Sequence, residues 1–354
     1  MKQIRDNYMV EIRKKHRKKE LKRFREMRME ELSSQNQRLP KKNIESIYQE
    51  LSDLRNTIQE LLKTKEPTLG LIDAIRDVRV IVSNDPENSI PLKEFLRTDL
   101  SDTLIELLEE QYREMHLIQS DVLWTFINIT GVADEGILFE LDKKGLLNNL
   151  SHTLLNPKTE SILDSALYIL TNYAGTSTGL RDRVFEIPAF EEFLLGGISP
   201  YSGNFDVCFS AATLYSNCLR GPYHPKFDQG ACLMQPIIKI AEVFSEDEKV
   251  QTEVCWALIY FVQAEDYSLK RLKMIVDSDY LVTFIKCALR HPKSTSALIC
   301  LLKILTFYTE LPSENEDLVV KLFDDHMIQV NFSLLQKKSK MKKIQFFSKF
   351  LTFF

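Results

Sequence analysis

Glycine and proline are scarce in this chain, with 11 and 12 residues among 354. Because both residues favour turns, their scarcity favours long helices over many short strands. No uncharged apolar run reaches the roughly 18 residues that would suggest a membrane span, and the charged N-terminus lacks the apolar segment of a secretory signal. The six cysteines include no CxxC pair, which argues against a disulfide scaffold or a zinc ribbon. We therefore expect a soluble intracellular protein with no membrane partner.

Motifs of catalytic and cofactor-binding sites are also missing. The sequence has no GxxxxGK[ST], GxGxxG, HExxH or GxSxG motif, and its six histidines lie far apart, with no metal-ligand spacing. The hydrophobic content of 44% is nevertheless enough to build a core. We expect a folded protein that is not an enzyme and has neither a cofactor nor a metal.

Positive charge is concentrated at the N-terminus. Residues 1–31 contain 12 Lys or Arg and 6 Asp or Glu, a net charge of +6, whereas the remainder contains 34 and 44, a net charge of −10. Residues 8–32 lack Gly and Pro and predict a helix, but their apolar stripe is thin, so we expect this arm to order on binding. An acidic protein surface, or the acidic body itself, is the expected partner. Direct nucleic-acid binding is disfavoured because six acids are mixed into the arm and the body is acidic.

The body repeats with a period near 43 residues. Five segments share a helix rich in small and aromatic residues that ends in a polar residue. The polar residue stands at steps of 44, 45, 43 and 43 residues, at Asn128, Asn172, Asn217, Tyr260 and Lys303. Four residues earlier stand Trp124, Tyr168, Thr213, Trp256 and Ile299. A period in this range is typical of armadillo and HEAT arrays, in which each unit is two or three helices.

The four-residue offset places the aromatic and the asparagine on one helix face, one turn apart. If stacking preserves the register, the repeats form a ladder along one groove. An asparagine amide can both donate to and accept from a peptide backbone, and an aromatic wall suits the stem and charge of Lys or Arg. The pattern therefore predicts a groove for an extended basic peptide. For the aromatic and the asparagine of any single repeat, core packing and helix capping remain the alternative.

Two of these features resemble the importin-α family. The arm MVEIRKKHRKKELKR at residues 9–23 is similar to the importin-β-binding segment, and segments such as WALIY at 256–260 are similar to the third helices of the family's armadillo repeats. The resemblance implies an all-α, right-handed armadillo-repeat superhelical solenoid preceded by a basic N-terminal helix. Residues 1–32 would be the importin-β-binding helix, 33–43 a linker, and 44–354 an array of about six to seven repeats, the last partial.

The resemblance also implies the partners and their sites. Importin-β would bind the arm, cargo proteins would present basic nuclear localisation signals to the groove, and the protein would shuttle between cytoplasm and nucleus. The cargo groove would comprise Trp124, Asn128, Tyr168, Asn172, Asn217, Trp256 and Tyr260. Importin-β would contact Arg13, Lys14, Lys15, Arg17, Lys18, Lys19, Lys22 and Arg23. Lys22, Arg23 and Arg25 would be autoinhibitory, lying in the groove when importin-β is absent.

Several positions depart from the family pattern. Thr176 stands where the family has an Asp that pairs with a cargo lysine, and Thr213 stands where it has a Trp. Ile299 replaces an expected Arg, and Lys303 an expected Asn. The alternative hypothesis is therefore an importin-α-derived armadillo scaffold whose eroded groove binds another protein ligand.

Overall fold

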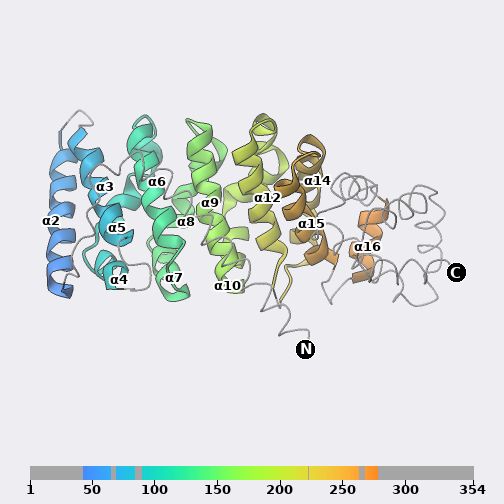
Figure 1. Ribbon diagram of the computed structural model, residues 1–354, viewed down its shortest axis with the longest axis horizontal. Helices are drawn as coiled ribbons and strands as arrows, with labels where there is room; N and C mark the ends of the chain where they lie inside the picture. Colours follow the sequence, from blue (N-terminus) through green and yellow to red (C-terminus); the bar gives the residue numbers. More distant parts are fainter. Residues whose placement is uncertain (1–42, 65–68, 84–89, 222, 263–267, 278–354) are drawn as a thin grey trace. The chain divides into compact units, whose positions relative to one another are not determined.

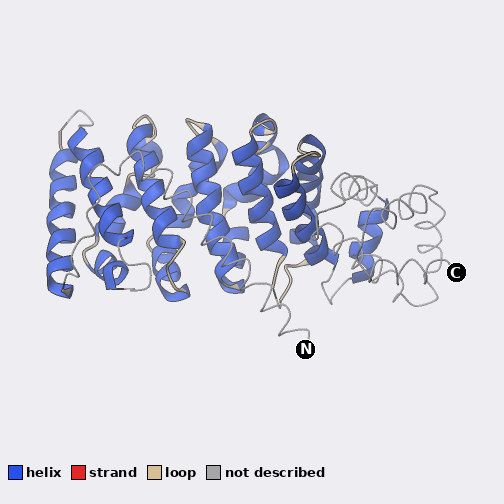
Figure 2. Cartoon of the chain, viewed as in Figure 1, coloured by secondary structure: helices blue, strands red, loops and turns tan. Residues whose placement is uncertain are grey.

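The structure, a computed structural model, describes residues 43–64, 69–83, 90–221, 223–262 and 268–277. Within these ranges every regular element is helical (Figure 2). The chain divides into two compact units, one ending at Thr176 and one beginning at Ser177. Among the residues described, no helix has the length and apolar character needed to cross a membrane.

The first unit contains eight α-helices and one short 3-10 turn within its described ranges. The neighbouring helices α3, α6 and α9 are packed side by side (Figure 1). In chain order the elements are α2 (Ile44–Leu62), α3 (Leu69–Ser83), α4 (Ile90–Arg97), α5 (Leu100–Glu106), η1 (Glu110–Tyr112), α6 (His116–Thr130), α7 (Glu135–Lys143), α8 (Leu146–Leu155) and α9 (Glu160–Thr176).

The second unit repeats the same succession of short and long helices. Its long helices α12 and α15 pack against each other. The described elements are α10 (Thr178–Phe185), α11 (Pro188–Glu192), a π-helical turn η2 (Phe193–Gly197), η3 (Ser199–Tyr201), α12 (Phe205–Leu219), α13 (Phe227–Cys232), α14 (Met234–Val243), α15 (Glu248–Val262) and α16 (Ser268–Asp277). Four three-helix repeats can thus be followed, and they end with α6, α9, α12 and α15. We call these four the third helices.

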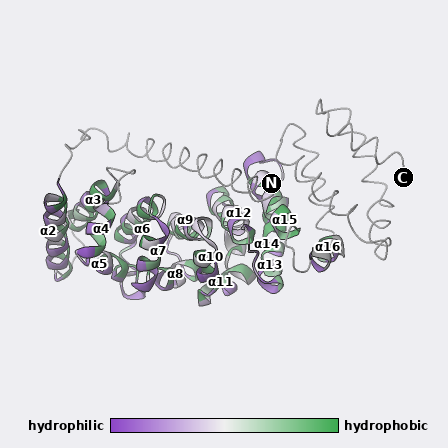
Figure 3. Ribbon diagram, turned by 90° about the horizontal axis from the view of Figure 1, so that it is seen from below, coloured by the Kyte–Doolittle hydropathy of each residue, from purple (hydrophilic) through white to green (hydrophobic). Residues whose placement is uncertain are grey.

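The third helices are buried on nearly all sides. In α9, for example, twelve of the seventeen residues are buried, from Ile162 to Gly175. Such a helix carries little amphipathic contrast because neighbouring repeats cover it from several directions. The shorter outer helices mix hydrophobic and hydrophilic residues along their length (Figure 3). Each repeat therefore depends on its neighbours to bury its core.

Side-chain hydrogen bonds connect neighbouring repeats at the spacing of the sequence period. Arg55 donates to the carbonyl of Thr98, 43 residues away, at 3.2 Å. Asn149 donates to the carbonyl of Ile105, 44 residues away, at 3.1 Å. Each bond joins roughly equivalent positions in successive repeats, so the three-dimensional repeat has the period read from the sequence.

The turn between the first two helices of a repeat uses a left-handed residue. Gly145 precedes α8 with φ of 96°, and Asp99 precedes α5 with φ of 56°. Glycine adopts this conformation without strain, and Asp is among the few other residues that tolerate it. The same sharp turn therefore recurs in two repeats although only one of them has the glycine.

The predicted all-α armadillo fold is confirmed, and the four repeated segments from 122 to 260 are the third helices α6, α9, α12 and α15. The basic arm at 1–32, the linker up to residue 42, and the fifth segment with Ile299 and Lys303 lie outside the described residues. The division into arm, linker and array stays a prediction.

A buried tyrosine tests the packing between the helices of one repeat. The Tyr173 hydroxyl is fully buried and donates to the carbonyl of Leu138 at 3.1 Å. We expect Tyr173→Phe to lower the free energy of unfolding by about 1 kcal/mol, since one buried hydrogen bond is lost. Tyr112→Phe, which removes an exposed hydroxyl bonded to Glu106, is the matched control and should cost less than about 0.5 kcal/mol. Urea unfolding followed by circular dichroism would measure both, and equal losses would contradict the packing described.

Candidate functional site

Each third helix leaves one narrow stripe of its surface accessible. On α9 this stripe is Glu160, Ser161, Asp164, Tyr168 and Thr176, and every other residue of the helix is buried. On α12 it is Phe205, Asp206, Phe209 and Thr213. The residues recur every three to four positions, so they lie on one face. We call these faces the accessible stripes; any ligand of a third helix must bind there.

Two of the three predicted aromatic residues lie on the accessible stripes, and the third is almost buried. Trp124 on α6 and Tyr168 on α9 are both half-buried, and each leaves part of its ring accessible. In the second unit Trp256 is 7% exposed, and its ring stacks on Tyr260 with centroids 5.8 Å apart and an interplanar angle of 26°. Trp124, Tyr168 and Trp256 thus occupy the same helical phase in their own repeats, and Tyr260 stands one turn after Trp256.

The predicted asparagines are almost enclosed. Asn128, Asn172 and Asn217 are 6%, 4% and 1% exposed. Asn172 Nδ2 donates to Thr130 Oγ1 at 3.0 Å, across 42 residues, and so connects α9 to α6. This bond between repeats gives one amide of the ladder a structural role that the sequence pattern did not predict.

The two threonines that depart from the family pattern turn their hydroxyls onto their own helices. Thr176 Oγ1 donates to the carbonyl of Asn172, and Thr213 Oγ1 donates to the carbonyl of Phe209, both at 2.8 Å. Such bonds to the preceding turn are common for threonine in helices. Neither side chain supplies a negative charge or a ring at its position.

Carboxylates on the accessible stripes were missed by the sequence reasoning. Asp121 precedes Trp124 by three residues, Asp164 precedes Tyr168 by four, and Glu253 precedes Trp256 by three. All three residues are partly accessible, and their spacing puts each acid about one turn from its ring. The signal was present in the sequence as an acid three or four residues before the aromatic. An aromatic face beside a carboxylate suits a Lys or Arg side chain.

Asp121 already has two cationic partners in the first unit. Its Oδ1 lies 3.4 Å from Arg76 Nε and 3.3 Å from Arg79 Nη1, both on α3. The side chains of Arg79 and Asp121 are each only 14% exposed. The sequence did not reveal this pairing because the residues stand 45 and 42 positions apart. Asp121 is therefore neutralised within the fold.

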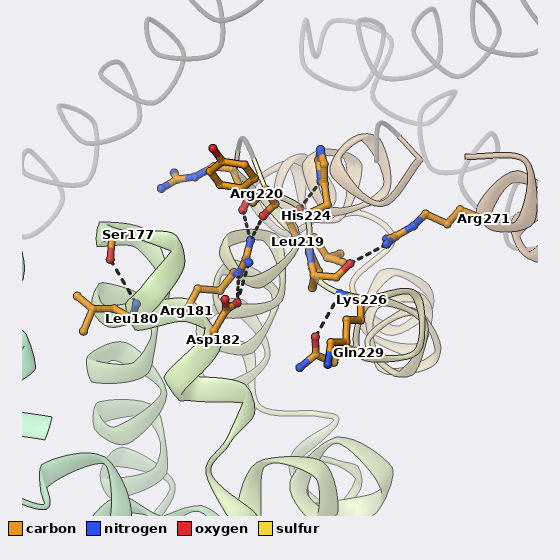
Figure 4. Close-up of polar contacts among 12 residues, drawn as sticks. Ser177, Leu180, Arg181, Asp182, Leu219, Arg220, His224, Lys226, Gln229 and Arg271 are labelled. Atoms are coloured by element: carbon orange, nitrogen blue, oxygen red, sulfur yellow. Dashed lines mark hydrogen bonds and ion pairs between the residues drawn. The ribbon is translucent and has the colours of Figure 1, made fainter. Parts of the chain in front are cut away.

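Two buried arginines hold the segment that follows α12 (Figure 4). Arg181, 2% exposed, donates through Nη1 to the carbonyls of Arg220 and Tyr223, and its Nη2 is paired with Asp182 at 2.7 Å. Arg271 is fully buried, and its Nη2 donates to the carbonyl of Pro225 at 2.7 Å. Burial of a guanidinium is costly unless it is well bonded. This segment, three residues beyond Asn217, is thus fixed in place.

The thiols of Cys208 and Cys218 on α12 have raised pKa values. Burial raises the pKa of Cys208 to about 11 and also raises the pKa of Cys218. The reactive form is the thiolate, so both groups are poor nucleophiles near neutral pH. Within the ranges that the structure describes, His, Cys, Asp and Glu side chains form no group able to hold a metal ion.

Solved structures with a similar backbone define the class of the fold. A designed armadillo repeat protein in complex with the peptide (KR)4 has a TM-score of 0.55 and 17% identity, covering 72% of this chain and 98% of the designed one. Another, from computationally designed armadillo repeat proteins for modular peptide recognition, has a TM-score of 0.56 and 15% identity, covering 72% and 99%. The fold is that of an armadillo-repeat protein.

Curated relatives place the sequence more closely. Importin subunit alpha-6 of Arabidopsis thaliana is 25% identical over 276 residues, which are 77% of this chain and 48% of the relative. Importin subunit alpha-1b of Oryza sativa subsp. japonica is 25% identical over 220 residues, 60% of this chain and 38% of the relative. The chain thus spans about half, or less, of the length of these relatives. No family model matches the sequence. The chain is a divergent, importin-α-like armadillo-repeat protein.

Removing the charge of Asp121 tests its pairing with α3. We expect Asp121→Asn to lower the free energy of unfolding by about 1–2 kcal/mol, because two guanidinium contacts lose their charged acceptor and the one from Arg79 is largely buried. Asp73→Asn is the control, since Asp73 lies 3.8 Å from the same Arg76 but is 71% exposed, and it should cost less than about 0.5 kcal/mol. Denaturant titration of both variants would show the difference, and an unaffected Asp121→Asn protein would refute the pairing.

Proposed function

We propose that this protein is a nuclear import adaptor that binds basic nuclear localisation signals on its accessible stripes and importin-β through its N-terminal arm. The observation that carries the proposal is the recurrence of an aromatic ring with a carboxylate about one turn away on three of the four third helices, as at Tyr168 and Asp164. The adaptor catalyses no reaction and shuttles between cytoplasm and nucleus.

The physical match is between the accessible stripes and an extended cationic chain. Rings such as Trp124 and Tyr168 offer a face to the alkyl stem and charge of Lys or Arg. The carboxylates Asp164 and Glu253 offer charge-assisted hydrogen bonds, which are about twice as strong as neutral ones. In the first unit Asp121 already faces Arg76 and Arg79 of α3.

The asparagines have a secondary part in the proposal. Asn128, Asn172 and Asn217 stand one turn beyond the aromatic position of their own helices and are nearly enclosed, so each supports the stripe of its own helix. Trp256 and Tyr260 close the site in the second unit. The named relatives support the proposal, since they are importin α subunits, and so does a structural neighbour that holds the basic peptide (KR)4.

The basic arm gives the second half of the proposal. Its partner contacts would be Arg13, Lys14, Lys15, Arg17, Lys18, Lys19, Lys22 and Arg23. Lys22, Arg23 and Arg25 compete with cargo for the acidic body when importin-β is absent. Because attraction between a +6 arm and a −10 body is screened by salt, this competition weakens as ionic strength rises.

A second candidate function rests on the enclosed amides and on the two threonines. Asn172 is bonded to Thr130, Thr176 adds no charge, and Thr213 adds no ring. These observations favour an importin-α-derived scaffold whose eroded groove binds a different protein ligand. The two candidates differ in whether the protein binds a lysine-rich signal peptide.

Peptide binding separates the two candidates. We expect a labelled lysine-rich signal peptide to bind the full chain with micromolar or tighter affinity, and Tyr168→Ala to weaken binding about tenfold, as is typical of an aromatic contact in a binding site. Asp164→Asn should weaken it about two- to tenfold through the lost charge-assisted contact. Fluorescence anisotropy would measure all three proteins.

The matched control for Asp164→Asn is Glu140→Gln, which removes an exposed carboxylate of α7 that is bonded to Lys143. It changes the net charge equally, so the same loss in both variants would mean that only overall charge matters. If neither the unmodified chain nor a chain without the basic arm binds the signal peptide, the result favours the scaffold.

The arm variant Arg13→Ala, Lys18→Ala, Arg23→Ala tests the partner assignment. We expect it to abolish capture by importin-β, because three cations of a short basic helix are lost, and to raise the affinity for added signal peptide, because Arg23 no longer competes. The melting temperature should not change, since the arm has too few apolar residues to contribute a core. Retained capture by importin-β would refute the assignment.

A further inference from the structure

Phe205 and Phe209 place two aromatic rings on the accessible stripe of α12. The rings are stacked, with centroids 5.8 Å apart and an interplanar angle of 4°. Phe244, which follows α14, meets Phe205 edge-on at 5.8 Å and 77°. Phe205 is 36% exposed, and the other two rings are half-buried. We call these three residues the phenylalanine patch.

The patch lies where the ring pattern of the third helices is interrupted. Trp124, Tyr168 and Trp256 occupy the aromatic position of their repeats, but α12 has Thr213 there. Phe209 stands four residues before Thr213, and Phe205 four residues before Phe209, so both lie on the same stripe one and two turns earlier. In α12 the accessible ring is therefore displaced toward the start of the helix.

The surroundings of the patch are strongly acidic. Asp206 follows Phe205 directly and is exposed. The segment on either side of Phe244 is EVFSEDEK, in which four of the eight residues are acidic. Asp247 uses its carboxylate to cap α15, accepting from the backbone amides of Lys249 and Val250 at 2.9 Å. The charged residues adjoining the patch are Asp206, Glu242, Glu246, Asp247 and Glu248 against Lys249.

We propose that the phenylalanine patch is a subsite for an arginine side chain of the bound basic peptide, which gives the second unit a preference for arginine over lysine. The inference rests on the proposed function and specifies the chemistry of its ligand in this unit. A guanidinium is planar, stacks on aromatic faces and is less strongly hydrated than an ammonium. The acidic surroundings supply the complementary charge.

Charge decides the occupant of this surface. An apolar side chain would gain contact with the rings but would draw neighbouring carboxylates such as Asp206 and Glu248 out of water, which is costly. A guanidinium covers the ring face with its own plane and leaves those carboxylates with a cationic neighbour. The stacked pair presents its rings on a helix whose other sides are buried, so little ordering is needed on binding.

The test compares labelled octa-arginine and octalysine on the full chain and on Phe205→Leu, which keeps an apolar side chain but removes the ring face. We expect the affinity for octa-arginine to fall about two- to fivefold, as for an exposed cation–π contact, and that for octalysine to fall less than about twofold. The arginine preference of the unmodified chain should therefore shrink. Val243→Ala, which trims an exposed side chain next to Phe244, is the control and should change neither affinity.

A second variant keeps the inference testable if Phe205→Leu impairs folding. Asp206→Asn changes only an exposed carboxylate and should weaken both peptides, more at low salt than at high salt. An unchanged arginine preference in Phe205→Leu would overturn the subsite while leaving the proposed function intact. Tighter binding of an alternating lysine–leucine octamer than of (KR)4 would also overturn it, in favour of an apolar ligand. If the unmodified chain binds neither octa-arginine nor octalysine, the proposed function itself fails, and the subsite falls with it.

Discussion

The side-by-side packing of the third helices within each unit is the constraint on which the rest of the structure depends. No single repeat has enough apolar surface to form a closed core, so each must be covered by the next. Helices such as α9 therefore become apolar around most of their circumference. Among the described residues, the accessible stripe is the part of each third helix that stays partly exposed, so its side chains are the least constrained by this packing.

Buried polar side chains form hydrogen bonds to the next repeat at about the spacing of the sequence period. Asn172 reaches Thr130, and Arg181 reaches the carbonyl of Tyr223, each across 42 residues. Buried amides and guanidinium groups need such partners. A residue that stands at the same helical position in every repeat can therefore either bond to the neighbouring repeat or face a ligand. At Asn172 the first use is directly visible, which is why an amide ladder alone is a weaker indicator of a peptide site than a ladder of accessible rings.

The accessible stripe also explains how this chain can keep the fold while diverging to 25% identity with importin α subunits. Replacing a ring by Thr213 costs no core packing, because Thr213 is half-buried on the stripe and bonds its own helix. Phe205 and Phe209 supply rings elsewhere on the same face. Divergence on the stripe alters partly exposed side chains, whereas divergence on the buried faces would disturb the neighbouring repeats.

The sequence by itself determined the helical class, the period near 43 residues and the phase of Trp124, Tyr168 and Trp256, because local periodicity records which side of a helix meets other helices. It also carried the acids before each ring, although these were not recognised. Only the tertiary structure decided that the asparagines are enclosed, that Arg76 and Arg79 neutralise Asp121, and that Phe244 meets Phe205. These features depend on residues from different helices that stacking brings together, and a pattern within one helix contains no information about the side chain that will lie opposite it.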